Sequence, residues 1–171
     1  MPNIQNIISS HNKLVLTKTA QQHTAHAESE CNCRQKNNCP LKGKCQAKGI
    51  VYQATVTNED NNEQETYIGL TEGTFKTRYL NHTCSFRNEK RKRATELSKH
   101  IWSLKQSNTQ HSIRWKIIKK CPPYSNRTKR CNLCLYEKCI IIYHPELSSL
   151  NKRNELISTC RHRKKYLLCN Q

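Results

Sequence analysis

The chain has 171 residues, and its 30 lysines and arginines outnumber its 12 aspartates and glutamates, which gives a net charge of +18 at pH 7. This excess predicts a polyanionic partner. It favours nucleic acid over a membrane, because the longest apolar run, 133–143, is too short to span a bilayer and contains Glu137 and Lys138. The N-terminal residues show no basic region followed by an apolar core of signal-peptide length, which predicts an intracellular, reducing compartment.

Eleven cysteines are the second unusual feature of the composition. An odd number without a secretory signal favours metal ligation over the disulfide framework of a secreted protein. Residues 1–30 are polar and without a sustained period, and they are predicted to be a linker or the remnant of an upstream junction. Residues 31–48 form a cysteine-rich knot in which four thiolates within fifteen residues are predicted to bind one tetrahedral zinc: Cys31, Cys33, Cys39 and Cys45.

The next residues predict a β-hairpin followed by a helix. Residues 50–56 alternate between two faces, residues 58–62 form a polar turn, and residues 66–68 resume the extended pattern. Apolar and aromatic residues at helical spacing over 75–86 then predict a helix whose exposed side is basic.

A second helix, a third strand and a third helix complete the predicted core. Helical spacing returns over 97–104, residues 113–117 alternate like a strand, and Pro122 with Pro123 ends that strand. A helix is expected over about 131–143. The fold class is therefore α+β, a small three-stranded antiparallel sheet flanked by helices, with an N-terminal cysteine-rich zinc-binding extension.

A second zinc site is predicted near the C-terminal end. Cys131 and Cys134 have the spacing of a zinc-knuckle pair, and Cys160 with His162 would close the ligand set. The alternative is that Cys131 and Cys134 simply pack, since positions i and i+3 also share a helix face.

Two short stretches with two downstream residues resemble the opening of a GIY-YIG nuclease domain. Tyr52 in Ile50-Val51-Tyr52 falls on the tyrosine of the first signature, although Ile50 stands in the glycine's place and Gly49 lies one residue early. Tyr67 in Tyr67-Ile68-Gly69 falls on the second signature. Arg78 and His82 match the family's helix arginine and histidine, which the helical pitch places on one face. The resemblance covers about residues 49–154.

The resemblance implies a metal-dependent DNA endonuclease that hydrolyses phosphodiester bonds by nicking a strand. The family's metal-binding glutamate corresponds to Glu137, with Glu96 as the rival, and its late asparagine to Asn154, with Asn151 as the alternative. A single carboxylate suits magnesium or manganese, which also takes waters and phosphate oxygens.

The implied roles follow from the chemistry of each group. Arg78 would spread its guanidinium over the charge that develops on the phosphate. Tyr52 is a candidate general base, which requires nearby cations to lower its pKa, and His82 is either its partner or the base itself. Tyr67 would orient water or phosphate. Asn154 would hold the active-site helix or contact phosphate.

The resemblance narrows to the C-terminal endonuclease of Penelope-like retrotransposons. It rests on Cys31-Asn32-Cys33-Arg34-Gln35-Lys36, on residues 95–102 and on residues 150–163. It implies a nuclease domain over 49–158 and a basic tail over 159–171. It also implies a nuclear location, with DNA, the element's RNA and a reverse transcriptase domain as partners.

Two basic segments are predicted to contact DNA phosphates. They are Lys90, Arg91, Lys92 and Arg93, which also resemble a nuclear localisation signal, and Arg161 with Arg163 in the tail. The alternative function is a noncatalytic, zinc-stabilised nucleic-acid-binding module from a decayed element.

Overall fold

A computed structural model describes residues 31–122, 131–152 and 160 of the chain. The main elements follow the predicted order of strand, strand, helix, helix, strand, helix. They are β1 (Ile50–Asn58), β2 (Gln64–Thr71), α2 (Phe75–Arg87), α3 (Glu96–Gln106), β3 (His111–Lys120) and α4 (Asn132–Tyr143). Short 3-10 turns lie at Lys36–Asn38, Glu89–Arg91 and Pro145–Leu147. The predicted α+β fold is thereby confirmed, and the predictions for residues 1–30 and 161–171 lie outside the described residues.

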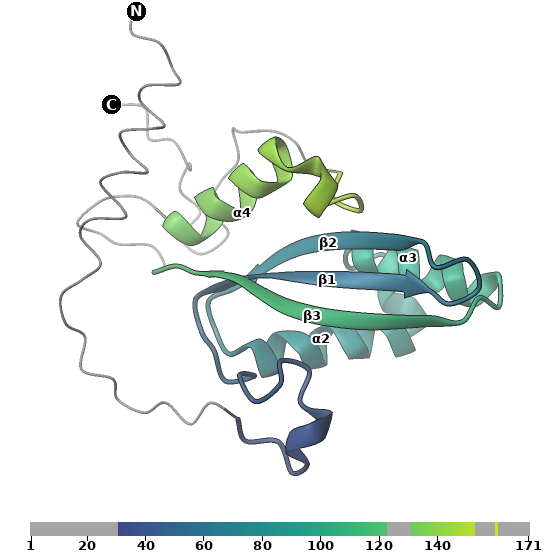
Figure 1. The fold of residues 1–171 in the computed structure, drawn as a ribbon, viewed down its shortest axis with the longest axis horizontal. Helices are drawn as coiled ribbons and strands as arrows, with labels where there is room; N and C mark the ends of the chain where they lie inside the picture. Colours follow the sequence, from purple (N-terminus) through teal and green to yellow (C-terminus); the bar gives the residue numbers. More distant parts are fainter. Residues whose placement is uncertain (1–30, 123–130, 153–159, 161–171) are drawn as a thin grey trace, which may run out of the picture.

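The sheet is antiparallel with the strand order β2-β1-β3 (Figure 1). The central place of β1 follows from its sequence, because Ile50, Val51 and Tyr52 are consecutive and all are fully buried, so both faces of the strand are covered. Gly49 precedes β1 with a φ of +59°, and a Cβ there would lie 2.7 Å from the carbonyl oxygen of Cys121. A glycine is therefore required where β1 meets the end of β3.

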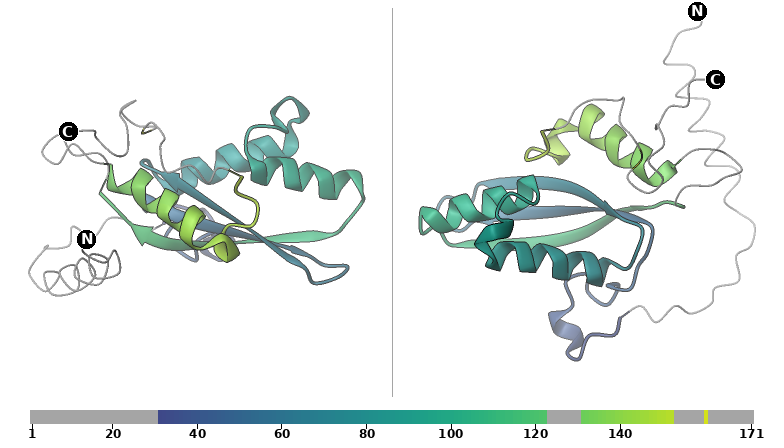
Figure 2. Two further views of the ribbon diagram at one scale, coloured as in Figure 1. Left: turned by 90° about the horizontal axis from the view of Figure 1, so that it is seen from above. Right: turned by 180° about the vertical axis from the view of Figure 1, so that it is seen from behind.

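Helices cover both faces of the sheet (Figures 1 and 2). Side chains from α2 and α3 pack with Tyr52, Ala54 and Val56 on one face. On the other face, α4 packs with Val51 and Ile68. The alternation along β1 thus divides the hydrophobic core into two clusters, one for each layer of helices.

The free edge of β2 is covered by the chain that follows α4. The backbone N–H of Leu150 donates to the carbonyl of Thr66, and the hydroxyl of Ser149 accepts from the N–H of Thr66. Asn151 continues this pairing along the strand: its Oδ1 accepts from the N–H of Ile68 at 2.8 Å, and its Nδ2 donates to the carbonyl of Ile68 at 2.9 Å. The segment therefore satisfies edge groups that would otherwise be open to another strand.

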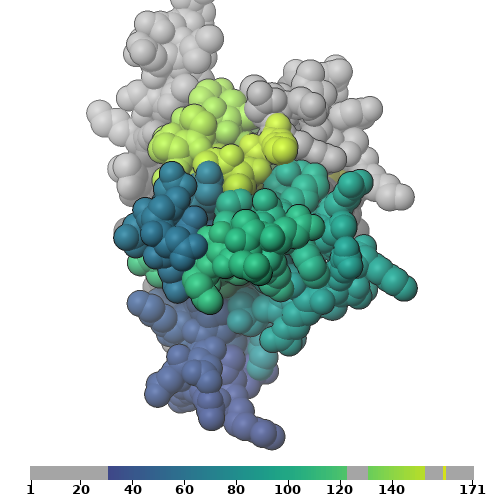
Figure 3. Space-filling model, turned by 90° about the vertical axis from the view of Figure 1, so that its right-hand side faces the viewer, coloured from purple at the N-terminus to yellow at the C-terminus, as the bar shows by residue number. Residues whose placement is uncertain are grey.

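The cysteine-rich segment 31–48 forms a lobe that projects from the body of the molecule (Figure 3). It docks on the N-terminus of α2, where the first N–H groups of a helix lack intrahelical partners. The N–H of Phe75 donates to the carbonyl of Ala47 at 2.9 Å, and the N–H of Lys76 donates to the carbonyl of Cys45 at 2.8 Å. The lobe therefore caps α2. None of the helices in the described part of the chain is both long and apolar enough to cross a membrane.

Candidate functional site

Three of the residues predicted to be catalytic meet at one hydroxyl group. The Nε of Arg78 donates to the hydroxyl oxygen of Tyr52 at 2.9 Å, and the Nε2 of His82 lies 2.7 Å from the same oxygen. Tyr52 comes from the central strand, whereas Arg78 and His82 come from α2, four residues apart. The helical pitch places both on the face of α2 that packs on β1. The structure thus brings the phenol of Tyr52 together with a guanidinium 26 residues later and an imidazole 30 residues later in the sequence.

Gly69 makes room for the Tyr52 hydroxyl. Gly69 is the cross-strand partner of Tyr52, and a Cβ at this position would lie 2.5 Å from the hydroxyl oxygen and 3.0 Å from the ring of Tyr67. Both distances are shorter than an ordinary van der Waals contact. The glycine of the second tyrosine stretch is therefore needed to admit both tyrosine rings.

Burial sets the protonation state of this group. Burial raises the pKa of Tyr52 above its ordinary value, with a further increase from Tyr67, and these effects outweigh the lowering by Arg78. Burial together with the positive charge of Arg78 lowers the pKa of His82 to about 3. At neutral pH both groups are uncharged, so the Tyr52 hydroxyl, which accepts from Arg78, donates a hydrogen bond to His82 in the tautomer whose Nε2 carries no proton.

The pKa shift of Tyr52 is opposite to the one expected from the sequence. The sequence led us to expect that nearby cations would lower the pKa of this phenol. Arg78 does act in that direction, but desolvation is the larger effect. Burial also acts to lower the pKa of Arg78, and the contacts of its guanidinium with Tyr52 and Tyr67 outweigh that effect and raise it, so Arg78 keeps its charge.

Tyr67 packs at the same centre, and Glu137 acts on it electrostatically. Tyr67 is buried on the same face of the sheet as Tyr52, and its ring packs edge-on against His82 with the centroids 6.0 Å apart. Glu137 is 4% exposed on α4, and its carboxylate acts electrostatically on Tyr52. The neighbouring Lys138 is buried as well, and buried charged side chains are rare unless they are paired or bind a ligand.

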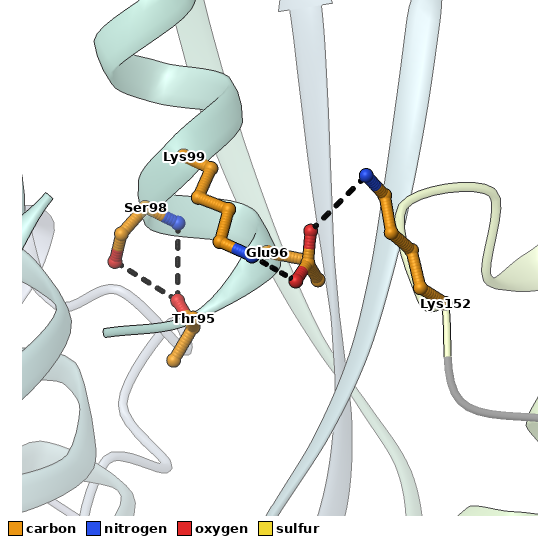
Figure 4. A network of polar contacts seen from close by, with 5 residues as sticks. All are labelled: Thr95, Glu96, Ser98, Lys99 and Lys152. Carbon is orange, nitrogen blue, oxygen red and sulfur yellow. Dashed lines mark hydrogen bonds and ion pairs between the residues drawn. The ribbon is translucent and has the colours of Figure 1, made fainter. Parts of the chain in front are cut away.

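Glu96, the rival for the metal-binding role, is engaged elsewhere (Figure 4). It lies in the first turn of α3, after the N-cap Thr95, where its charge complements the helix dipole. Its carboxylate pairs with Lys99 at 2.5 Å and with Lys152 at 3.7 Å. The hydrogen bond from Lys99 is the main cause that lowers the pKa of Glu96. These ion pairs balance the charge of the Glu96 carboxylate, so no metal ion is needed to explain it.

Of the two candidate asparagines, the structure describes only the alternative. Asn154 lies outside the described residues. Asn151 holds the backbone of Ile68 between Tyr67 and Gly69 with two hydrogen bonds. It therefore fixes the strand that carries the second tyrosine, a contact that the sequence did not indicate.

A surface hollow of 380 Å³ opens beside Arg78, between the end of β2 and the start of α2. Most of the side chains that line it are small or polar. The lining residues are Leu70, Thr71, Glu72, Gly73, Thr77, Arg78 and Asn81. Apart from Arg78, sequence reasoning did not select these residues. The available signal was their position next to the second tyrosine stretch and within one turn of Arg78.

The basic segment 90–93 lies between α2 and α3, and Lys90, Arg91 and Arg93 are exposed. Lys92 pairs with Glu89 at 2.9 Å. A hollow of 270 Å³ here is lined by Lys92, Arg93, Lys99, Trp102, Ser103 and Gln106. Sequence reasoning missed Trp102, which supplies an aromatic face beside these cations. Arg161 and Arg163 lie outside the described residues.

Two cysteine clusters are each arranged so that they could hold a metal ion such as zinc. Cys31, Cys33, Cys39 and Cys45 place their sulfurs within 4.8 Å of one another, and Cys131, Cys134 and Cys160 do the same. In the first cluster, the Sγ–Sγ distances are 3.6 Å for Cys33 and Cys45 and 3.7 Å for Cys31 and Cys45. The predicted first ligand set is thus brought together in full. His162, predicted for the second, lies outside the described residues.

Comparison with known proteins gives no relative from which a function could be carried over. No protein-family model, no curated protein and no solved structure matches the chain. The geometry of the site therefore has to support any functional conclusion by itself.

Proposed function

We propose that this chain is a metal-dependent DNA endonuclease of the GIY-YIG type, which hydrolyses phosphodiester bonds. The observation that carries the proposal is the convergence of Arg78 and His82 on the hydroxyl of Tyr52, at 2.9 and 2.7 Å, with Glu137 acting on the same hydroxyl. A cation and a neutral base in contact with one phenol, with a buried carboxylate that acts on it electrostatically, are groups that phosphodiester hydrolysis can use. The net charge of +18 supplies the attraction to a polyanion.

The protonation states support a proton relay through Tyr52. A buried phenol with a raised pKa is a poor base by itself. It can accept a proton from a water on its oxygen while it passes its own proton to the neutral Nε2 of His82. His82 is then the final proton acceptor, and the imidazolium forms against the effects of burial and of Arg78, which both lower its pKa. The two candidates for the general base thus act as one unit.

Arg78 supplies positive charge to the scissile phosphate. Its guanidinium lines the 380 Å³ hollow and contacts Tyr52 on the inner side, so a phosphate in that hollow would lie between the cation and the relay. Loss of such a donor costs about 100-fold to 1000-fold in rate.

Glu137 offers one carboxylate, which fits a magnesium or manganese ion that is held mainly by water molecules and by the substrate. Among the residues the structure describes, the groups of three or more metal-ligating side chains are the two cysteine clusters. Glu137 would therefore be the main protein ligand, which suits a hard cation that keeps several waters. When bound, the cation polarises the phosphate and stabilises the leaving oxygen.

The N-terminal cluster is proposed to bind a structural zinc. Its thiol set is complete, and the thiol of Cys39 is hydrogen-bonded by the backbone N–H groups of Gly43 and Leu41, an arrangement that stabilises a thiolate. Because the lobe caps α2, the zinc would support the helix that carries Arg78 and His82. The resemblance to Penelope-like endonucleases, with their nuclear location and retroelement partners, belongs to the same proposal.

Nicking of supercoiled plasmid by the purified full chain, with magnesium, tests the proposal. Arg78→Ala is compared with Arg87→Ala, which removes the same charge from an exposed position on α2. Glu137→Gln is compared with Glu59→Gln, which neutralises an exposed carboxylate. The expected result is loss of nicking by about 100-fold or more in the first member of each pair, with plasmid binding retained.

Two outcomes would overturn the nuclease proposal. One is a wild-type chain that shifts the plasmid on a gel but leaves it intact in magnesium and in manganese. The other is equal nicking by each matched pair. The first outcome supports the alternative of a noncatalytic binding module, which the complete burial of Tyr52 favours.

A further inference from the structure

Three buried thiols meet at the start of α4. Cys131 is the N-cap residue of this helix, Cys134 lies in its first turn, and Cys160 lies beyond the end of the described segment that covers β2. All three sulfurs lie within 4.8 Å of one another, and each residue is 4% exposed or less. We propose that these three thiolates bind a second zinc ion, separate from the ion of the N-terminal lobe.

The sulfur spacing matches a shared metal ion and not a disulfide. Zinc–sulfur bonds of about 2.3 Å in a regular tetrahedron separate the sulfurs by about 3.8 Å. The Sγ atoms of Cys134 and Cys160 lie 3.7 Å apart, the same separation as Cys31 and Cys45 in the first cluster. A disulfide requires about 2.05 Å. The thiol of Cys131 is also hydrogen-bonded to both other thiols, which puts all three pairs in contact.

The end of the helix favours thiolates at this place. The backbone N–H of Cys134 donates to the sulfur of Cys131. Such a hydrogen bond is expected where two metal-binding cysteines lie at the start of a helix. The first turn of α4 has no acidic residue. The positive end of the helix dipole is thus left to be complemented by the negative charge of the thiolates.

The site would fasten α4 and the distal chain to each other. Cys134 and Glu137 are three residues apart and buried on the same side of α4. A zinc at Cys134 would therefore restrain the face of α4 that carries Glu137. This consequence rests on the proposed nuclease function, whereas the zinc site itself does not.

Zinc counting by native mass spectrometry of the full chain, purified under reducing conditions, tests the site. Two zinc ions per chain are expected for the wild type, one for Cys134→Ser, one for Cys33→Ser and none for the double variant. Cys139→Ser is the matched control, because it replaces a half-buried thiol on the same helix outside the cluster, and it should keep two. Substitution with cobalt(II) should give thiolate charge-transfer absorption that falls in each single cluster variant.

Three results would overturn the inference. They are a wild-type count of one that falls to none in Cys33→Ser, a count of two in Cys134→Ser, and a zinc-free Cys134–Cys160 disulfide in the reduced preparation. Plasmid nicking is measured separately on the same samples. A chain that holds two zinc ions and does not nick refutes the nuclease proposal alone, and a chain that nicks with one zinc, which is lost in Cys33→Ser, refutes the second site alone.

Discussion

Replacement of Gly69 by alanine probes the centre of the site with one methyl group. The new Cβ would lie 2.5 Å from the Tyr52 oxygen and 2.6 Å from its Cζ, whereas ordinary contact begins at 3.4 Å, so the ring has to retreat by about 0.9 Å. Tyr52 is fully buried, and its ring packs against Phe75 and Trp115 with centroids 5.2 and 5.9 Å away. Such overpacking costs about 1 to 3 kcal/mol in the free energy of unfolding.

Urea unfolding monitored by tryptophan fluorescence measures this cost, with Gly73→Ala as the control. A Cβ at Gly73 would have no neighbouring atom within 4 Å, and the residue has no positive φ, so its replacement should change the free energy of unfolding by less than about 0.5 kcal/mol or stabilise slightly. If the nuclease proposal holds, Gly69→Ala also lowers nicking by about 100-fold, because a displacement near 1 Å misplaces the hydroxyl. Equal stability of the two alanine variants would refute the packing of Tyr52 against Gly69.

Two further predictions concern acid stability and the edge of the sheet. The pKa of His82 is about 3 in the folded chain and 6.5 as its ordinary value, so the unfolded chain takes up a proton first as the pH falls. This contribution to stability is complete above pH 6.5 and is lost at about 1.4 kcal/mol per pH unit down to pH 3, or about 2 kcal/mol by pH 5. Urea unfolding at pH 7.5 and 5 should show that loss in the wild type and not in His82→Gln, and an equal loss in both would contradict the pKa shift. Asn151→Ala removes both hydrogen bonds to Ile68 and should cost about 1 to 3 kcal/mol, whereas a difference below about 0.5 kcal/mol in the same assay would show that water replaces them.

The order of elements was predictable because each helix and strand carries its own periodicity. Residues 75–86 repeat apolar side chains at helical spacing and form α2, and residues 113–117 alternate and form part of β3. The central place of β1 could also have been inferred, because Ile50, Val51 and Tyr52 leave no polar face for solvent. Local pattern was therefore sufficient for the architecture.

The environment of the site was less predictable, because it depends on contacts between distant segments. The sequence identified Tyr52, Arg78 and His82 by resemblance, but the pKa of Tyr52 depends on how deeply β1 is covered, which no local pattern reveals. The hydrogen bonds of Asn151 to Ile68 join residues 83 apart. Trp102 lies beside Lys92 only because α3 folds back next to the basic segment.

The two cysteine clusters occupy equivalent positions in the architecture, and this bears on why so small a fold carries so many thiols. The N-terminal lobe supplies the carbonyls of Cys45 and Ala47 to the first N–H groups of α2, and Cys131 with Cys134 opens α4. These two helices lie on opposite faces of the sheet (Figure 2). One carries Arg78 and the other Glu137, so a metal ion at the start of each would restrain both halves of the proposed site against the same central strand. A site assembled from two faces needs restraint on both, because helices of about three turns are marginally stable without tertiary support.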